Sequence, residues 1–237
     1  MFLFKRKEII LDCFTNNKTA LDFAPIQKAS NYYPSWFNSM PIDVDGITHK
    51  NSTLKRCEGF INYYRNGLIM PLWSDLGILI QGLDYKWNFA DNKSIAMVHG
   101  SNQWDAFVNP KEYGHLKIVS PWHFKCNKEI DFLFKRPYWN FDPFNDISII
   151  EGIINFKYQH TTNINLFLKI NQFKQLLLKY NEPLLHILPL TEYEIKVKNH
   201  LIDDKEFYGM IADMSFNNNY RIRKKVMKSK EKKCPFH

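Results

Sequence analysis

Residues 116–197 decide the fold of this chain, beginning with LKIVSPWHF at 116–124 and IDFLFK at 130–135. The stretch is a series of short runs rich in β-branched and aromatic residues, separated by polar residues, glycine or proline. Runs of this kind, separated by turn residues, predict a compact antiparallel sandwich or barrel. The expected strands are Leu116–Phe124, Ile130–Lys135, Ile147–Tyr158, Ile164–Ile170, Lys174–Tyr180, Leu184–Leu190 and Tyr193–Val197.

One of these runs, residues 173–180, fits two structures. Phe173, Leu176, Leu177 and Tyr180 have the spacing of one face of a helix. We favour a strand, because Asn181-Glu182-Pro183 would then form a hairpin into the next run.

The segment before this series shows the same strand character. Residues 68–99 form an expected meander with strands at Leu68–Trp73, around Ile78–Phe89 and at Ile95–His99. Residues 54–66 predict a helix with Cys57 on its buried face, capped by Ser52 or Thr53 and followed by Gly67 at the C′ position.

The two ends of the chain differ from this central part. Residues 1–50 are irregular, with possible strands at Phe2–Phe4 and Ile9–Phe14 and an aromatic cluster around Pro34, and we expect them to wrap the core. Residues 199–214 have helical spacing. We expect one domain over residues 1–220 and a basic C-terminal tail over 221–237.

Composition excludes several classes of protein. Hydrophobic residues make up 45% and aromatic residues 16% of the 237 residues, which is enough for a real core and argues against global disorder. Only 9 residues are glycine, which argues against glycine-rich phosphate loops. We expect a soluble protein with no secretory signal, no membrane span and reduced thiols on its four cysteines.

The net charge of +8 is concentrated at the C-terminus. Residues 221–237 hold eight basic residues and one acidic residue, whereas the other 220 residues hold 24 basic and 23 acidic residues. A near-neutral body is not typical of a protein that grips a phosphate backbone. We expect the tail to contact a protein partner, or nucleic acid without specificity, through Arg221, Arg223, Lys224, Lys225, Lys232, Lys233 and Phe236.

Motifs of catalysis and of metal binding are missing from the sequence. None of the eight histidines is followed two residues later by Asp, Glu or His, and there is no GxSxG or Walker loop. The Cys234–His237 pair supplies half of a zinc site. A nonlocal metal site made by Asp75, His99 and His186 is the alternative, so we expect no cofactor, with a divalent metal as the second possibility.

Three short segments combine tryptophan with polar groups near strand ends, in Pro71–Asp75, His99–Trp104 and Ser120–His123. Indole rings beside acid and amide groups suit contacts with sugars or peptides. If the segments converge, they form a binding pocket. Its candidate residues are Trp73, Asp75, His99, Gln103, Trp122 and His123.

The motifs PSWF (34–37), TLKRCEGF (53–60), NGLIMPLWSD (66–75), SPW (120–122) and EPLLHILP (182–189) resemble an uncharacterised family of tailed phages that infect marine cyanobacteria and related bacteria. The resemblance spans most of residues 20–195. It implies a viral origin and a cupin-like or jelly-roll sandwich, and it carries no catalytic residue. Members of that family tend to place a glycine near the 181–183 turn, where this chain has Asn181 and Glu182.

Together these observations predict a mainly β protein with some α+β character: an antiparallel jelly-roll or cupin-like double-stranded β-sandwich with a few peripheral helices. The expected function is non-enzymatic binding, with other virion or host proteins as partners, in the host cytoplasm or in the virion. The alternative is a metal-dependent oxygenase or a sugar-modifying enzyme on the same fold.

Overall fold

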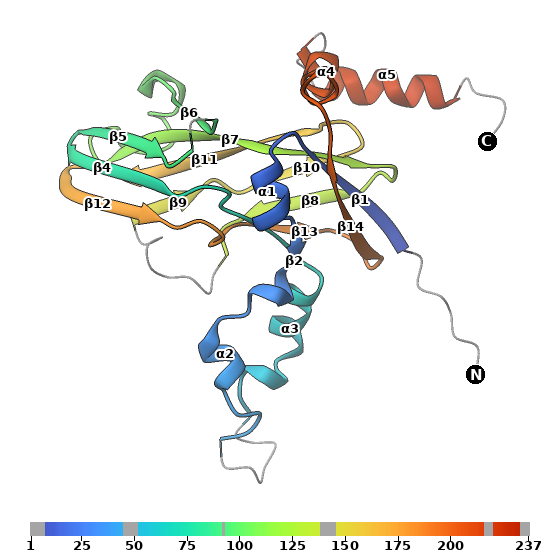
Figure 1. Ribbon diagram of the computed structural model, residues 1–237, viewed down its shortest axis with the longest axis horizontal. Coiled ribbons are helices and arrows are strands. Elements are labelled where there is room, and N and C mark those ends of the chain that lie inside the picture. Colours follow the sequence, from blue (N-terminus) through green and yellow to red (C-terminus); the bar gives the residue numbers. More distant parts are fainter. Residues whose placement is uncertain (1–7, 45–51, 92, 138–145, 216–219, 233–237) are drawn as a thin grey trace.

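The computed structural model of the chain describes residues 8–44, 52–91, 93–137, 146–215 and 220–232. Strands dominate, and the few helices lie at the periphery of the sheets (Figure 1). The expectation of a mainly β protein with peripheral helices is confirmed at this level.

The largest sheet has the strand order β14-β1-β7-β11-β9, with β6 also paired to β7. All of its pairs are antiparallel except β1 with β14, which run parallel from Glu8↔Glu194 to Thr15↔Leu201. The sheet is therefore mixed, whereas the sequence predicted an antiparallel one. A parallel pair needs a long connection, and here nearly the whole chain connects the two strands. The strands are β1 (Glu8–Thr15), β6 (Ile95–Val98), β7 (Tyr113–Cys126), β9 (Ile147–Ile149), β11 (Thr161–Lys169) and β14 (Glu194–Leu201).

Two smaller sheets complete the body, with strand orders β10-β8-β13-β3-β2 and β12-β4-β5. Among the described residues, the strand pairs of these two sheets are all antiparallel. Their strands are β2 (Gln27–Lys28), β3 (Leu68–Pro71), β4 (Leu76–Gly82), β5 (Asp84–Phe89), β8 (Asp131–Lys135), β10 (Gly152–Asn155), β12 (Gln172–Leu178) and β13 (Pro183–Pro189).

One hydrophobic core joins the three sheets. Along β7 the even-numbered side chains, including Trp122 and Phe124, are buried in this core. Phe124 stacks on Phe156 with ring centroids 4.6 Å apart, and Phe132 of β8 lies 4.9 Å from the same ring. Offset aromatic pairs of this kind add to the stabilisation that comes from burying their area.

The turns differ more from expectation than the strands do. Residues 147–158 form two strands, β9 and β10, in different sheets. The run expected over 173–180 is a strand, as favoured, but β12 ends at Leu178. Because β12 and β13 lie in different sheets, the expected hairpin at 181–183 is wrong. Asn181 has a φ of 62°, which asparagine adopts more readily than most residues.

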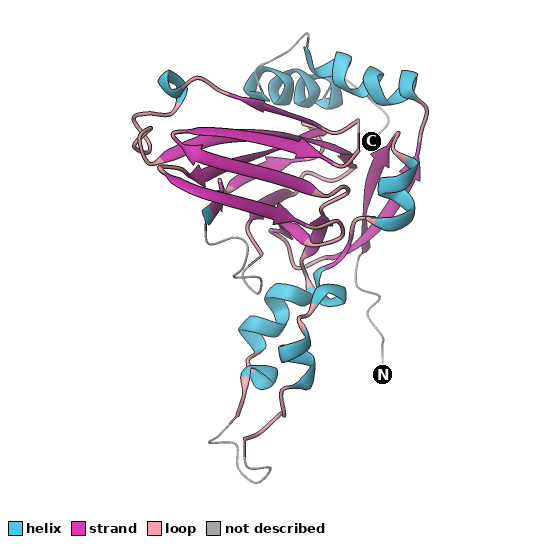
Figure 2. Cartoon of the chain, turned by 60° about the vertical axis from the view of Figure 1, so that its left-hand side comes forward, coloured by secondary structure: helices cyan, strands magenta, loops and turns pink. Residues whose placement is uncertain are grey.

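Residues 29–44 and 52–66 form an arm that projects from the sheets and does not wrap them (Figure 2). The arm contains η1 (Ala29–Tyr32), α2 (Ser35–Ser39), η3 (Leu54–Arg56) and α3 (Glu58–Arg65). It has its own aromatic cluster, in which Tyr33 stacks on Phe37 with centroids 4.6 Å apart.

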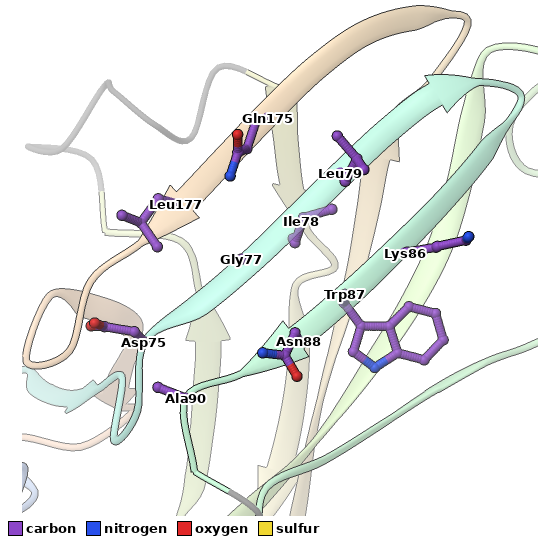
Figure 3. Close-up of a pocket in the computed structure, with 10 residues that line it drawn as sticks. All are labelled: Asp75, Gly77, Ile78, Leu79, Lys86, Trp87, Asn88, Ala90, Gln175 and Leu177. Atoms are coloured by element: carbon purple, nitrogen blue, oxygen red, sulfur yellow. The ribbon is translucent and has the colours of Figure 1, made fainter.

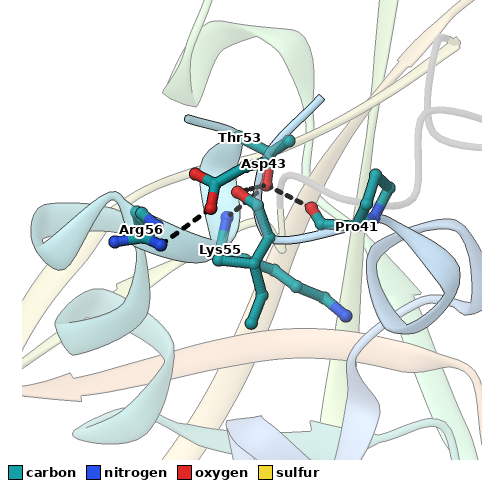
Figure 4. Close-up of polar contacts among 6 residues, drawn as sticks. Pro41, Asp43, Thr53, Lys55 and Arg56 are labelled. Carbon is teal, nitrogen blue, oxygen red and sulfur yellow. Dashed lines mark hydrogen bonds and ion pairs between the residues drawn. The ribbon is translucent and has the colours of Figure 1, made fainter. Parts of the chain in front are cut away.

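Polar contacts hold together the two strands of chain in this arm (Figure 4). The Thr53 hydroxyl contacts the Pro41 carbonyl at 2.6 Å and the Ile42 carbonyl at 3.0 Å, and Arg56 pairs with Asp43 at 2.7 Å. These contacts join residues 41–43 to residues 53–56.

The helix expected over 54–66 begins later than predicted. Thr53 caps η3, and Cys57, expected to be buried, is the exposed N-cap residue of α3. Gly67 follows the C-cap as expected, but the need for glycine at this position is steric. A Cβ atom at Gly67 would lie 1.8 Å from Nε2 of His186.

The remaining helices are α1 (Lys18–Phe23), η4 (Ser101–Gln103), α4 (Asp204–Ser215) and α5 (Tyr220–Lys232). Helix α4 falls where helical spacing predicted a helix. Residues 220–232 of the basic tail are helical, and α4 and α5 lie together at one end of the large sheet (Figure 1). Phe2–Phe4 and Cys234–His237 lie outside the described residues.

Candidate functional site

A cavity of about 460 Å³ lies where α4 covers the outer face of β7. It brings together Trp73 and His123, two of the six residues expected to form a pocket, from segments 50 positions apart. Its volume is within the range typical of small-molecule sites. The lining residues are Asn16, Asn17, Trp73, Lys93, Ser94, Ile95, Val119, Ser120, Pro121, His123, Asp204, Phe207, Tyr208 and Ile211.

The contact between His123 of β7 and Phe207 of α4 joins the two sides of this cavity. The two rings stack with centroids 3.9 Å apart and planes 10° apart. His123 is 2% exposed, and its Nδ1 atom has no hydrogen-bond partner among the described residues. Burial, and to a smaller extent the nearby His160, lower the pKa of His123 to about 4. The imidazole is therefore neutral at pH 7 and suits an apolar stack.

The polar groups of the cavity supply both donors and acceptors. The Trp73 Nε1–H donates to Ser94 Oγ at 2.8 Å, so the Ser94 hydroxyl can still donate its own hydrogen. Asn16 Nδ2 donates to Asp204 Oδ1 at 2.8 Å, which leaves the second oxygen of the carboxylate as an acceptor. Asp204 and Lys93 are the acidic and basic residues of the lining, so its formal charge is balanced.

Asp75 lines a different depression, of about 390 Å³, on the outer face of β4 and β5 (Figure 3). Its Oδ1 atom accepts a hydrogen bond from the backbone N–H of Tyr180 at 2.6 Å, and its own carbonyl accepts from Ala90 N at 2.9 Å. Asp75 thus ties the start of β4 to the end of β12.

His99 and Gln103 belong to a third place, the connection between β6 and β7. The His99 ring lies 4.9 Å from that of His115, and Trp104 Nε1 donates to the His99 carbonyl at 3.2 Å. Gln103 is exposed at the end of η4. Burial, followed by the charge of His99, lowers the pKa of His115.

Trp122 is fully buried in the core, and its Nε1 atom has no hydrogen-bond partner among the described residues. It faces away from His123, since neighbouring residues of a strand point to opposite faces of the sheet. Of the six candidate pocket residues, the structure therefore assembles only Trp73 and His123 in one cavity.

The basic tail is attached to the body through α5. Lys228 and Lys224 contact Glu129 at 2.8 and 3.1 Å. The hydrogen bond from Lys228 has the largest effect, and together the two lower the pKa of Glu129 to about 2. Arg223 lies 3.3 Å from Nε2 of His160.

The other residues expected to make the tail contact differ in what the structure describes. Lys225 is exposed, as are Ile222 and Val226, at 50% and 39%. Arg221 and Lys232 lie on α5, whereas Lys233 and Phe236 lie outside the described residues.

Metal-ligating side chains do not gather within the described part of the chain: no three His, Cys, Asp or Glu residues there are placed to hold an ion. Of the alternative metal set, His186 packs against both Tyr63 and Tyr64, whereas His99 and Asp75 lie in the two places given above. The helices in the described ranges are all too short or too polar to span a bilayer.

Sequence reasoning missed the residues of α4 as part of the site. The helical spacing of residues 199–214 includes Phe207 and Ile211 on one apolar face, but a periodic pattern does not reveal which strand that face covers. A comparison with known family models and with curated proteins found no match for this chain.

Proposed function

We propose that this protein is a non-enzymatic binding protein, and that it holds a small, neutral, hydroxyl-rich ligand of the saccharide class in the cavity beneath α4. The observation that carries the proposal is the combination, in one cavity of about 460 Å³, of aromatic side chains with charge-balanced polar groups that include both donors and acceptors.

The aromatic walls fit the apolar faces of a sugar ring. Tyr208 is 59% exposed and meets the Phe207 ring edge-on at 5.6 Å, whereas Trp73 and Phe207 are buried and shape the interior. Aromatic side chains provide large contact area together with a polar tip, so they suit amphipathic ligands.

The rim fits hydroxyl groups because each hydroxyl both donates and accepts hydrogen bonds. Ser94 can donate, and the second oxygen of Asp204 can accept. Because Lys93 and Asp204 balance each other, the lining favours a neutral ligand over a strongly charged one.

The test is saturation-transfer NMR with the methyl glycosides of glucose, galactose, mannose and N-acetylglucosamine. At least one should give a signal with the wild-type protein. Tyr208→Ala, which removes the exposed ring, and Ile211→Trp, which fills the mouth, should each abolish it. Ile222→Trp, a matched change on exposed α5, should leave it unchanged. Absence of a signal from all four glycosides would contradict the proposal.

A second contact, with an acidic protein partner, is favoured by the outer face of α5. Ile222 and Val226 lie one turn apart and are exposed, with Lys225 and Lys230 on the same helix also exposed. An apolar pair beside lysines fits an acidic amphipathic helix better than a phosphate backbone, which needs charge alone.

Fluorescence anisotropy with two labelled probes distinguishes these partners. The probes are an acidic amphipathic helical peptide, with Leu on one face and Glu on the other, and a short DNA duplex. Ile222→Ser with Val226→Ser should weaken binding of the peptide, and Lys225→Glu with Lys230→Glu should do so as well. If the serine variant binds the peptide as well as the wild type does, or if only DNA binds, the protein contact is refuted.

The viral origin implied by the resemblance is part of the same proposal, as is a jelly-roll or cupin-like arrangement. The sequence motifs given above support the first, and the shared core between multi-stranded sheets supports the second. A place in the host cytoplasm or in the virion follows from the resemblance alone. Mass spectrometry of purified virus particles tests whether the protein is part of the virion. Its absence from the particles would contradict a place in the virion.

A further inference from the structure

We propose that strand β12 pairs with β12 of a second copy of this chain, so that two three-stranded sheets join edge to edge into one six-stranded sheet. The proposal does not depend on the ligand or on the α5 contact.

Strand β12 is an end strand of its sheet, with β4 as its neighbour on one side (Figure 1). Among the described residues, the backbone of Gln172–Leu178 pairs with no other strand. A free edge presents unpaired N–H and C=O groups in the pattern that another strand needs.

Two of the outward side chains of β12 are apolar and exposed. Phe173 is 86% exposed and Leu177 is 50% exposed, with Gln175 exposed between them. Leu79 of the neighbouring β4, opposite Gln175, is 42% exposed and extends this surface inward (Figure 3).

Two other end strands, β5 and β14, are protected by charge. On β5, at the opposite edge of the same sheet, the exposed positions are Asp84, Lys86 and Asn88. On β14, the exposed positions include Lys196 and Lys198. Charged side chains on an edge prevent unwanted pairing, and β12 lacks this protection on its outward face.

The sequence of β12 is complementary to itself. An antiparallel pair centred on Gln175 places Phe173 opposite Leu177 of the second copy, twice by symmetry, and the two Gln175 amides opposite each other. Aromatic–aliphatic pairs across strands are stabilising, and two facing amides can exchange hydrogen bonds. A two-fold axis makes the same patch serve both partners, as in most homodimers.

The charge that would oppose this pairing is already neutralised. Lys174 points to the other face of the strand, where it is paired with Asp146. In the proposed register Lys174 faces Leu176 of the second copy and not its own counterpart, so the two ammonium groups do not oppose each other.

The experiment is sedimentation equilibrium of the full chain, whose monomer has a mass of 28.3 kDa. Because strand pairing alone buries less area than a standard interface, the mass should rise toward the dimer only with increasing concentration. Wild-type protein that stays monomeric over a hundredfold concentration range would overturn the proposal.

Charge substitutions then test the register. Phe173→Lys with Leu177→Lys places like charges opposite each other and should abolish dimerisation. Phe173→Glu with Leu177→Lys places opposite charges in the same two pairs and should restore it. Asn88→Lys on the other edge should change nothing. Equal masses for the two β12 double variants, or loss of dimer on changing Asn88, would contradict the proposed pairing.

Discussion

The imidazole of His123 stacks on the phenyl ring of Phe207 with centroids 3.9 Å apart, and this contact attaches α4 to the outer face of the large sheet. Both side chains are buried, at 2% and 6% exposure. Because this contact holds α4 over β7, it maintains the cavity that is proposed as the binding site.

Phe207→Ala should loosen α4 selectively. The change removes a buried ring, which typically costs about 3 kcal/mol of unfolding free energy, although a peripheral helix can relax and reduce the loss. Hydrogen exchange should accelerate over residues 204–211 more than in β7. Tyr208→Phe, next to it, keeps the ring that meets Phe207 edge-on, so it is the control and should leave exchange nearly unchanged. Equal effects of the two variants would disprove a special role for the stack.

Acid should weaken the fold between about pH 6.5 and about pH 4. Burial lowers the pKa of His123 to about 4 and that of His186 to about 4, from an ordinary 6.5. Their stabilising contribution is complete above the unfolded pKa and is lost as the pH falls toward the folded value. Each can contribute up to about 3 kcal/mol. Urea midpoints measured across this window should fall, and His123→Phe should reduce the slope. An unchanged slope in that variant would count against a buried neutral His123.

Gly67 and Gly59 should respond oppositely to alanine. A Cβ at Gly67 would overlap the His186 ring at 1.8 Å, whereas a Cβ at Gly59 meets nothing within 4 Å. Gly67→Ala should therefore lower the unfolding free energy by more than about 2 kcal/mol. Gly59→Ala, within α3, should raise it by up to about 1 kcal/mol. Thermal or urea unfolding checks both, and a mild effect at Gly67 would mean that His186 can move aside.

Glu129→Gln should release α5 in a salt-sensitive way. The carboxylate accepts from Lys228 and Lys224, and both contacts are partly exposed, so the global stability should change little. Hydrogen exchange over residues 222–230 should accelerate, and moderate salt should have the same effect on the wild type. Glu151→Gln, which affects a pair with Lys135 instead, is the matched control. Unchanged protection in Glu129→Gln would show that α5 is held by other contacts.

The strands were predictable because their signals are local. Alternation along Leu116–Phe124 and Thr161–Lys169 reflects burial of one face, and the sequence shows that directly. The pairing partners were not predictable: β12 and β13 follow one another in the chain yet lie in different sheets, and β1 pairs with β14 from the other end. Such contacts depend on the packing of the whole body.

The candidate pocket shows the same division. The pattern of tryptophan beside polar residues predicted that Trp73 and His123 belong to one pocket, and they do share a cavity. The same pattern included Trp122, whose direction along β7 takes it into the core, and His99, which packs with His115. The wall supplied by α4 could not be found from the sequence, because a helical face does not identify the strand that it covers.

The Trp73 indole N–H provides the most direct test of ligand binding in the cavity beneath α4, since it lies in the lining and donates to Ser94. In a nitrogen-15 NMR titration with the glycoside that gives the strongest saturation-transfer signal, the Trp73 indole resonance should shift in a saturable way. The indole resonance of Trp122, buried in the core, should stay in place. A titration that leaves Trp73 unmoved while the glycoside binds, or that shifts both indoles equally, would contradict the proposed site.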